Sequence, residues 1–203
     1  VPGVLIGINE HLAWTTTSAD ADLEDIFVEK LNPSNSLQYW HDGAWRDMER
    51  RVERIEVRGA SPVEFEIFRT VHGPIIKWDK DKGIAYSHAM SYWGREIETL
   101  RGIAGFWRAR NTAEFARSAS NITSSHNFFC ATRDGDIGFW FTGKIPVRSR
   151  DADRRLPTPG TGEYDWKGDI AFSEMPQVIN PKQGYLVNWN NKPAPWVDNA
   201  DRP

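Results

Sequence analysis

The stretch Val52-Glu-Arg-Ile-Glu-Val-Arg58 decides the fold class, together with Val63-Glu-Phe-Glu-Ile-Phe-Arg69 just after it. Apolar and charged side chains alternate with a period of two in both stretches, so each is predicted to be a strand that buries one face of a sheet. An Asp-Gly step at 42–43 is typical of a hairpin turn. Further strand-like runs surround these stretches, at 4–9, 11–17, 26–31, 37–41, 45–48, 71–78 and 83–88.

In the middle of the chain the spacing of apolar residues changes from that of strands to that of helices. Ile97, Leu100, Ala104 and Trp107 recur at helical spacing, which predicts a helix there. A second short helix is predicted through residue 119, because Asn111 and Glu114 have the spacing of a capping box.

Strands resume after the helices, at 128–132 and 137–142, and a run at 184–189 is also apolar and strand-like. Residues 146–181 between them are rich in Pro, Gly, Asp and Arg and are expected to be irregular. The chain is therefore predicted to be an α+β protein, mostly antiparallel β-sheet with few helices. We expect residues 1–203 to be a single partial domain.

Composition excludes several partner classes. The 203 residues carry a formal net charge of -3, which gives no general attraction to nucleic acid. No apolar stretch approaches the roughly 18 residues that span a bilayer, so no membrane partner is expected. The single cysteine, Cys130, excludes an internal disulfide and is expected to be a small buried apolar residue.

Two short stretches carry candidate chemistry, each with a structural alternative. Asn190 and Asn191 follow the apolar run at 184–189, where a carboxamide can donate to an oxyanion or can simply form a turn. The acidic residues at 20–25 can supply oxygen ligands to calcium or can be a solvated turn. The five histidines show no pair at zinc-enzyme spacing, so a zinc enzyme is not predicted.

Motifs spread over nearly the whole chain carry a family resemblance. In order they are Pro2-Gly3-Val4 with Gly7 and Asn9, Ala13-Trp-Thr-Thr-Thr17, Asp22 with Asp25-Ile-Phe27, Arg69-Thr-Val-His-Gly-Pro-Ile75, Gly135-Asp-Ile-Gly-Phe139 with Thr142-Gly143, Leu156-Pro-Thr-Pro-Gly-Thr-Gly162, Trp166-Lys-Gly168 and Asn188-Trp-Asn-Asn-Lys-Pro193. The set resembles the penicillin acylase family of N-terminal nucleophile hydrolases.

The resemblance implies part of a layered αββα sandwich and an amide hydrolase that works through an acyl-enzyme on an N-terminal serine. Its α-amino group is the general base, with a reference pKa of about 7.7 to 8.0 that suits neutral pH. Val1 has no nucleophilic atom, so we expect an internal fragment of the large subunit that is inactive by itself. A small (alpha) subunit from the same precursor, a periplasmic or secreted location, and self-association of the fragment through open strand edges are further expectations.

The resemblance also implies site residues. The oxyanion hole falls on the side chain of Asn190 and the backbone N–H of Ser18, and the acyl pocket falls on Ile6, Thr16 and His126. A structural calcium ion is expected, and its ligands fall on the following positions: Asp22, the carbonyl at Glu24, Asp25, a carbonyl at Arg154, and either Asp198 or Asp201.

The implied function is cleavage of the acyl side-chain amide of β-lactam antibiotics or of related N-acyl compounds such as N-acyl homoserine lactones. Two alternatives stand beside it. The ten tryptophans could make a non-catalytic β-rich domain that binds carbohydrate or a partner, if they form an exposed row. The parent protein could also be a scaffold of the same fold that has lost its chemistry.

Overall fold

The computed structural model describes residues 3–197, and contacts within the chain define two compact units. Unit 1 comprises residues 1–23, 91–147 and 168–203, and unit 2 comprises residues 24–90 and 148–167. Strands predominate in the described residues and nearly all pair antiparallel, which confirms the predicted α+β class. None of the described helices has the length and apolar character needed to cross a membrane. That residues 1–203 form a single partial domain stays a prediction.

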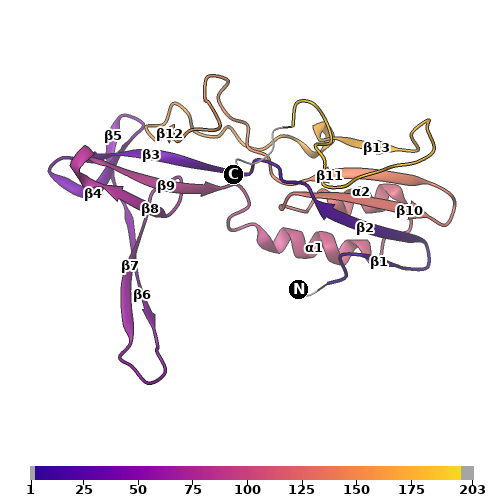
Figure 1. Ribbon diagram of the computed structural model, residues 1–203, viewed down its shortest axis with the longest axis horizontal. Helices are drawn as coiled ribbons and strands as arrows, with labels where there is room; N and C mark the ends of the chain where they lie inside the picture. The colour runs from indigo at the N-terminus through magenta and orange to yellow at the C-terminus, as the bar shows by residue number, and fades with distance from the viewer. Residues whose placement is uncertain (1–2, 198–203) are drawn as a thin grey trace. The chain divides into compact units, whose positions relative to one another are not determined.

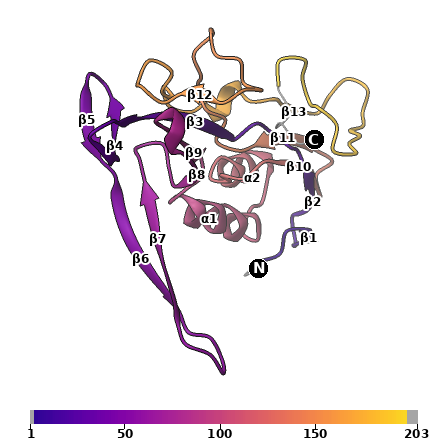
Figure 2. The ribbon, with the colours of Figure 1, turned by 60° about the vertical axis from the view of Figure 1, so that its left-hand side comes forward.

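Unit 1 contains a five-stranded antiparallel sheet with helices packed on it (Figure 1). The strand order is β1 (Gly7–Ile8), β2 (Leu12–Ser18), β10 (His126–Thr132), β11 (Ile137–Thr142) and β13 (Gln177–Ile179). The helices are α1 (Glu96–Phe106) and α2 (Thr112–Ala119), and they lie on the same side of the sheet (Figure 2). The predicted cap of α2 is confirmed, because the Asn111 side chain accepts a hydrogen bond of 2.9 Å from the Glu114 backbone N–H.

Aromatic packing joins the helices of unit 1 to one face of its sheet. Trp14, Phe128 and Trp140 of the strands are buried in one cluster with Phe106 and Phe115 of the helices. Burial of each such side chain contributes about 1.5 to 3 kcal/mol. Since strand side chains alternate, the residues between these aromatics belong to the opposite face. The helices and the sheet of unit 1 therefore form one α layer on one β layer. The full αββα sandwich, which has a second sheet and a second helical layer, stays a prediction.

Unit 2 is built on a second sheet. Its strands, in spatial order, are β5 (Ala44–Asp47), β4 (Asn35–His41), β3 (Glu24–Asn32), β9 (Ile84–Met90) and β8 (Ile75–Asp79), with β12 (Thr158–Pro159) paired parallel to β3. The hairpin predicted at Asp42-Gly43 is confirmed between β4 and β5, with φ angles of 49° and 76° at these two residues. Positive φ at both central residues is the geometry that favours an Asp-Gly sequence.

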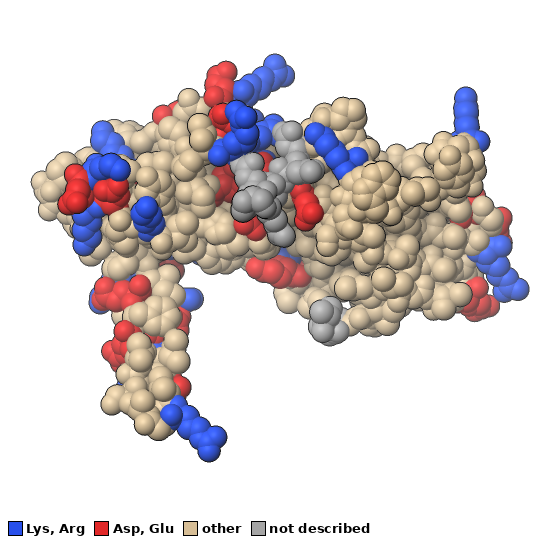
Figure 3. Space-filling view, viewed as in Figure 1, with Lys and Arg blue, Asp and Glu red and all other residues tan. Residues whose placement is uncertain are grey.

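A two-stranded ribbon of β6 (Glu49–Ile55) and β7 (Val63–Arg69) extends away from this sheet (Figure 1). The strands are confirmed, but the prediction that each buries one face is wrong: Val52, Val63 and Phe65 are 50%, 53% and 42% exposed. The ribbon has no third strand in the described residues, so these three side chains stay exposed, whereas Phe68 near its base packs on Trp78. Lys, Arg, Asp and Glu are interspersed over its visible surface (Figure 3).

Two other predictions differ from the structure. The expected strand at 184–189 is irregular, and Tyr185, Val187 and Trp189 in it are largely exposed. By contrast, the segment 146–181, expected to be irregular, contributes β12 and β13. Pairing explains both results, because β13 is held by β11 (Phe139 opposite Val178), and no sheet partner pairs with 184–189 in the described part of the chain.

Candidate functional site

A side-chain amide meets the end of β2 in unit 1. Asn190 Nδ2 donates a hydrogen bond of 2.7 Å to the backbone carbonyl of Ser18, 172 positions away in the sequence. The structure therefore brings together the two residues predicted to form an oxyanion hole. An amide nitrogen carries two hydrogens, and the Ser18 carbonyl accepts one of them. The second N–H can donate to another group.

The Asn190 backbone is held in a left-handed conformation, with φ at 75°. Asn188 Oδ1 stabilises this turn, because it accepts hydrogen bonds from the Asn190 N–H at 2.9 Å and from Thr17 Oγ1 at 2.6 Å. The two alternatives for Asn190 are thus compatible: its backbone forms a turn, and its side chain points to β2. Asn188 was not predicted as a site residue, although it stands in the same Asn-Trp-Asn-Asn motif.

Asn127 on β10 completes this group, which we call the amide cluster: Thr17, Ser18, Asn127, Asn188 and Asn190. The Asn127 side chain is fully buried, and its Nδ2 lies 3.4 Å from the Ser18 carbonyl. Its Oδ1 is buried without a hydrogen-bond partner in the described residues. All side chains of the cluster are uncharged. Such groups can orient a ligand and donate hydrogen bonds, and none of them is a strong base.

The predicted acyl-pocket residues are only partly brought together. Thr16 and His126 lie on the neighbouring strands β2 and β10, on the face that the helices cover. His126 Nδ1 lies 3.1 Å from Ser124 Oγ, and burial lowers the pKa of His126, which favours the neutral imidazole at neutral pH. Ile6 is 62% exposed and precedes β1.

A pocket of about 590 Å³ borders the amide cluster through Thr17 and Asn188. Ala13, Thr15, Phe129, Tyr185 and Leu186 are among the other residues that line it, so its wall is mainly apolar. This volume is in the usual range for small-molecule sites. Ile6, Thr16 and His126 do not line the pocket. The sequence did not predict it, because the segment at 185–188 reaches it without forming a strand.

The predicted calcium ligands fall in both units. Asp22 is buried in unit 1, whereas Glu24, Asp25 and Arg154 belong to unit 2. Asp25 Oδ2 accepts hydrogen bonds from Arg148 Nε at 2.7 Å and from Trp166 Nε1 at 2.6 Å. The set offers only carboxylate and carbonyl oxygens, which is the donor chemistry of a calcium site. Asp198 and Asp201 lie outside the described residues.

The tryptophans do not share one environment. Trp14 and Trp140 are buried in the core of unit 1, whereas five others are more than a third exposed. These five stand on separate segments of the two units: Trp45, Trp93, Trp107, Trp189 and Trp196. The two buried rings act in packing, and the distribution of the others does not support a carbohydrate platform.

Comparison with known proteins shows that one protein family matches nearly the whole chain. The penicillin amidase family matches residues 1–202. Penicillin G acylase of Escherichia coli is 37% identical over 192 residues, which cover 95% of this chain and 23% of that protein. An acyl-homoserine lactone acylase, QuiP, of Pseudomonas putida is 30% identical over 199 residues, covering 96% of this chain and 24% of that protein.

The fold agrees with a solved structure of the same group. The thermostable penicillin G acylase from Alcaligenes faecalis superposes with a TM-score of 0.93 at 46% identity, over 99% of this chain and 36% of that one. The chain thus spans about a quarter of the length of these two curated relatives.

Proposed function

Because the chain belongs to the penicillin amidase family, we propose that the whole protein hydrolyses the acyl side-chain amide of β-lactam antibiotics or of related N-acyl compounds such as N-acyl homoserine lactones. The observation that carries the proposal is the hydrogen bond from Asn190 Nδ2 to the Ser18 carbonyl. It places an amide donor beside the end of β2, with a mainly apolar pocket next to the amide cluster.

The reaction proceeds through an acyl-enzyme on an N-terminal serine outside this chain. The serine hydroxyl attacks the amide carbon, its proton passes to the α-amino group, and the proton then goes to the leaving amine as the C–N bond breaks. Water hydrolyses the ester and releases the acid. The second N–H of Asn190 and the backbone N–H of Ser18 donate to the oxyanion of each tetrahedral intermediate.

This role predicts a specific loss of activity. Removing one oxyanion donor costs about 10²- to 10³-fold in kcat, equivalent to about 2.7 to 4 kcal/mol. Asn190→Gly removes the amide and tolerates the positive φ, so we expect kcat to fall by that factor while the fold is kept. Asn190→Asp keeps the shape but cannot donate when ionised, and it is expected to lose activity as well.

The chain offers a matched control in Asn180. It is also an asparagine with positive φ (49°), lies in unit 1, and donates to Asp136 rather than to the amide cluster. Asn180→Gly should keep kcat near that of the parent. The measurement is hydrolysis of phenylacetyl, glutaryl and long-chain acyl amides by the full-length protein. Equal losses in the Asn180 and Asn190 variants would refute the oxyanion role.

The same panel separates the competing functions. Preference for phenylacetyl amides indicates penicillin-type substrates, and preference for long-chain amides indicates acyl-homoserine lactones. No turnover of any amide by a folded full-length protein would contradict the proposal and favour the scaffold without chemistry. The small subunit of the same precursor and a periplasmic or secreted location are parts of the same proposal.

We extend the proposal to a structural calcium ion held by the carboxylates of Asp22 and Asp25 and by carbonyls at Glu24 and Arg154. Calcium would compete with Arg148, which pairs with the Asp25 carboxylate at 2.7 Å, and would take no part in the bond-breaking steps. Addition of calcium to the full-length protein is expected to raise Tm, and magnesium is expected to do so less. Asp25→Asn should weaken this response, and a Tm indifferent to calcium would contradict the ligand set.

A further inference from the structure

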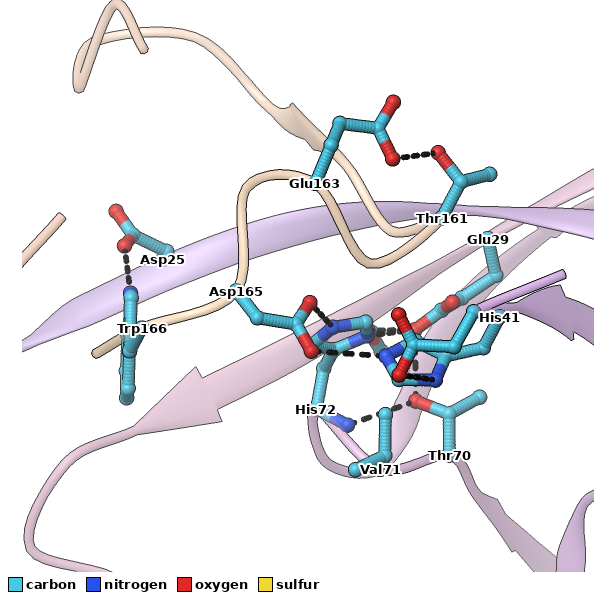
Figure 4. Close-up of polar contacts among 12 residues, drawn as sticks. Asp25, Glu29, His41, Thr70, Val71, His72, Thr161, Glu163, Asp165 and Trp166 are labelled. Atoms are coloured by element: carbon cyan, nitrogen blue, oxygen red, sulfur yellow. Dashed lines mark hydrogen bonds and ion pairs between the residues drawn. The ribbon is translucent and has the colours of Figure 1, made fainter. Parts of the chain in front are cut away.

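Two histidines and an aspartate converge in unit 2, in a group we call the histidine cluster: His41, His72 and Asp165 (Figure 4). His41 Nε2 lies 2.8 Å from Asp165 Oδ2, and His72 Nε2 lies 3.0 Å from Asp165 Oδ1. One potential ligand atom from each residue lies within 4.8 Å of the others.

Three separate stretches of the chain hold the histidine cluster. His41 ends β4, and His72 lies in the turn between β7 and β8, where Thr70 and Gly73 exchange backbone hydrogen bonds. Asp165 is on the loop after β12, which the Asp42 N–H fixes by donating to the Thr161 carbonyl at 3.1 Å. The cluster is therefore positioned by backbone contacts and does not depend on its side chains alone.

Glu29 fixes the orientation of His72 by contacting the ring nitrogen that faces away from Asp165. Glu29 is fully buried, and its Oε1 lies 2.9 Å from His72 Nδ1. The hydroxyls of Thr70 and Ser87 also donate to this oxygen, at 2.7 and 2.6 Å. When Nδ1 carries the proton and donates it to Glu29, the other ring nitrogen, Nε2, faces Asp165 with its lone pair. A carboxylate behind a histidine is the usual outer arrangement of a metal-ligating imidazole.

Arg46 lies close to the histidine cluster but pairs with Asp42, at 3.5 Å. Among the described residues, neither Glu29 nor Asp165 pairs with a lysine or arginine. Glu29 Oε2 and His41 Nδ1 are buried without hydrogen-bond partners in that part of the chain. Asp42 Oδ2 lies 3.5 Å from His41 Nδ1, and the two form an ion pair only if His41 is protonated. A divalent cation would balance the negative charges of the Glu29 and Asp165 carboxylates.

We propose that the histidine cluster binds a zinc ion through His41 Nε2, His72 Nε2 and one oxygen of Asp165, with water as the fourth ligand. Zinc is favoured over calcium because two of the three donors are imidazole nitrogens. Zinc bonds of about 2.0 to 2.2 Å at tetrahedral angles separate ligand atoms by about 3.4 Å. The two histidine-to-Asp165 distances, which go to different oxygens, therefore need to lengthen by about 0.4 to 0.6 Å, and the two Nε2 atoms, now within 4.8 Å of each other, need to come to about the same 3.4 Å separation.

Asp165 is the residue able to make this adjustment. Its side chain is 35% exposed, whereas those of His41 and His72 are 3% and 6% exposed. The exposed side also admits the water ligand. Zinc at this position would tie the loop after β12 to β4 and to the turn after β7, and would stabilise this part of unit 2. The proposal uses no residue of the amide cluster and does not depend on amide hydrolysis.

The test is zinc binding by the full-length protein after treatment with a chelator and dialysis. Calorimetric titration is expected to show one site, and cobalt in its place should give the visible absorption of a tetrahedral N/O site. His41→Gln and Asp165→Asn remove ligands and should weaken zinc binding at least 100-fold. Glu29→Gln changes the carboxylate behind His72 and should weaken it by about 10- to 100-fold.

His88→Gln is the matched control, because His88 Nε2 also pairs with a carboxylate in unit 2, that of Glu24 at 2.9 Å. Its zinc affinity should equal that of the parent protein. No binding by the parent protein, or equal binding by the ligand variants, would overturn the proposal. Should those variants fail to fold, X-ray absorption of the zinc-loaded parent decides: two imidazoles with oxygen ligands support the site, and any other shell refutes it.

Discussion

The amide cluster of unit 1 and the histidine cluster of unit 2 are both polar groups at strand ends, but they differ in charge. The amide cluster uses neutral amides, a hydroxyl and a backbone carbonyl, and Asn190 in it is exposed. The histidine cluster rests on the fully buried carboxylate of Glu29. Neutral hydrogen bonds contribute less to stability than bonds to a buried charge. The first arrangement suits binding and the second suits holding the fold together.

The histidines repeat this contrast. Burial lowers the pKa of His126 in unit 1, where Ser124 is its neighbour. Burial also acts to lower the pKa of His72, but hydrogen bonds and charge from Glu29 and Asp165 outweigh it, so the pKa of His72 is raised. Burial therefore sets the direction of the pKa shift at His126, whereas the combined effect of the two carboxylates sets it at His72.

The largest expected difference concerns Glu29. Glu29→Ala leaves the donors on Thr70, His72 and Ser87 without their acceptor, so the free energy of unfolding should fall by about 3 to 5 kcal/mol. Urea denaturation measures this loss. Glu66→Ala on the exposed ribbon removes a carboxylate paired with Arg50 and should cost less than about 1 kcal/mol. Similar costs for both variants would contradict the assigned role of burial.

The same substitution can be made in both clusters. Thr70→Val removes a hydroxyl that donates to the buried Glu29 carboxylate at 2.7 Å, and a bond to a charged group contributes about 1.5 to 3 kcal/mol. Thr17→Val removes a hydroxyl that donates to the neutral Asn188 amide at 2.6 Å, so about 0.5 to 1.5 kcal/mol is expected. The two losses, measured by urea denaturation, should keep this order. A larger loss at Thr17 would reverse the comparison.

The sequence predicted a turn and a helix cap correctly, because each of them depends only on residues close together in the chain. The Asp42-Gly43 turn and the Asn111 cap depend on neighbouring residues only, and both are confirmed. The apolar run at 184–189 failed as a strand, because a strand needs a partner that local pattern cannot show. The contact of Asn190 with Ser18 was anticipated through the family resemblance and not from spacing.

The histidine cluster was missed for a related reason. His41 and His72 are 31 positions apart and Asp165 a further 93, so no zinc spacing appears in the sequence. The weak signal in the sequence was that His41 stands just before the expected turn at Asp42-Gly43 and His72 just before Gly73-Pro74. The parallel pairing of β12 with β3, together with the hydrogen bond from the Asp42 N–H to the Thr161 carbonyl, brings the loop of Asp165 to them.

The smallest expected effect is the pH dependence due to His126. Because its pKa is lowered in the folded state, the unfolded chain binds the proton more readily as pH falls below the unfolded value of about 6.5. Its contribution to stability is therefore complete above that pH and declines below it, until the folded-state pKa is passed. His126→Gln does not titrate, so the parent's stability relative to this variant should decrease from pH 7 to pH 5 in urea denaturation. A relative stability that is constant or rises over this range would show that His126 is not kept neutral by burial.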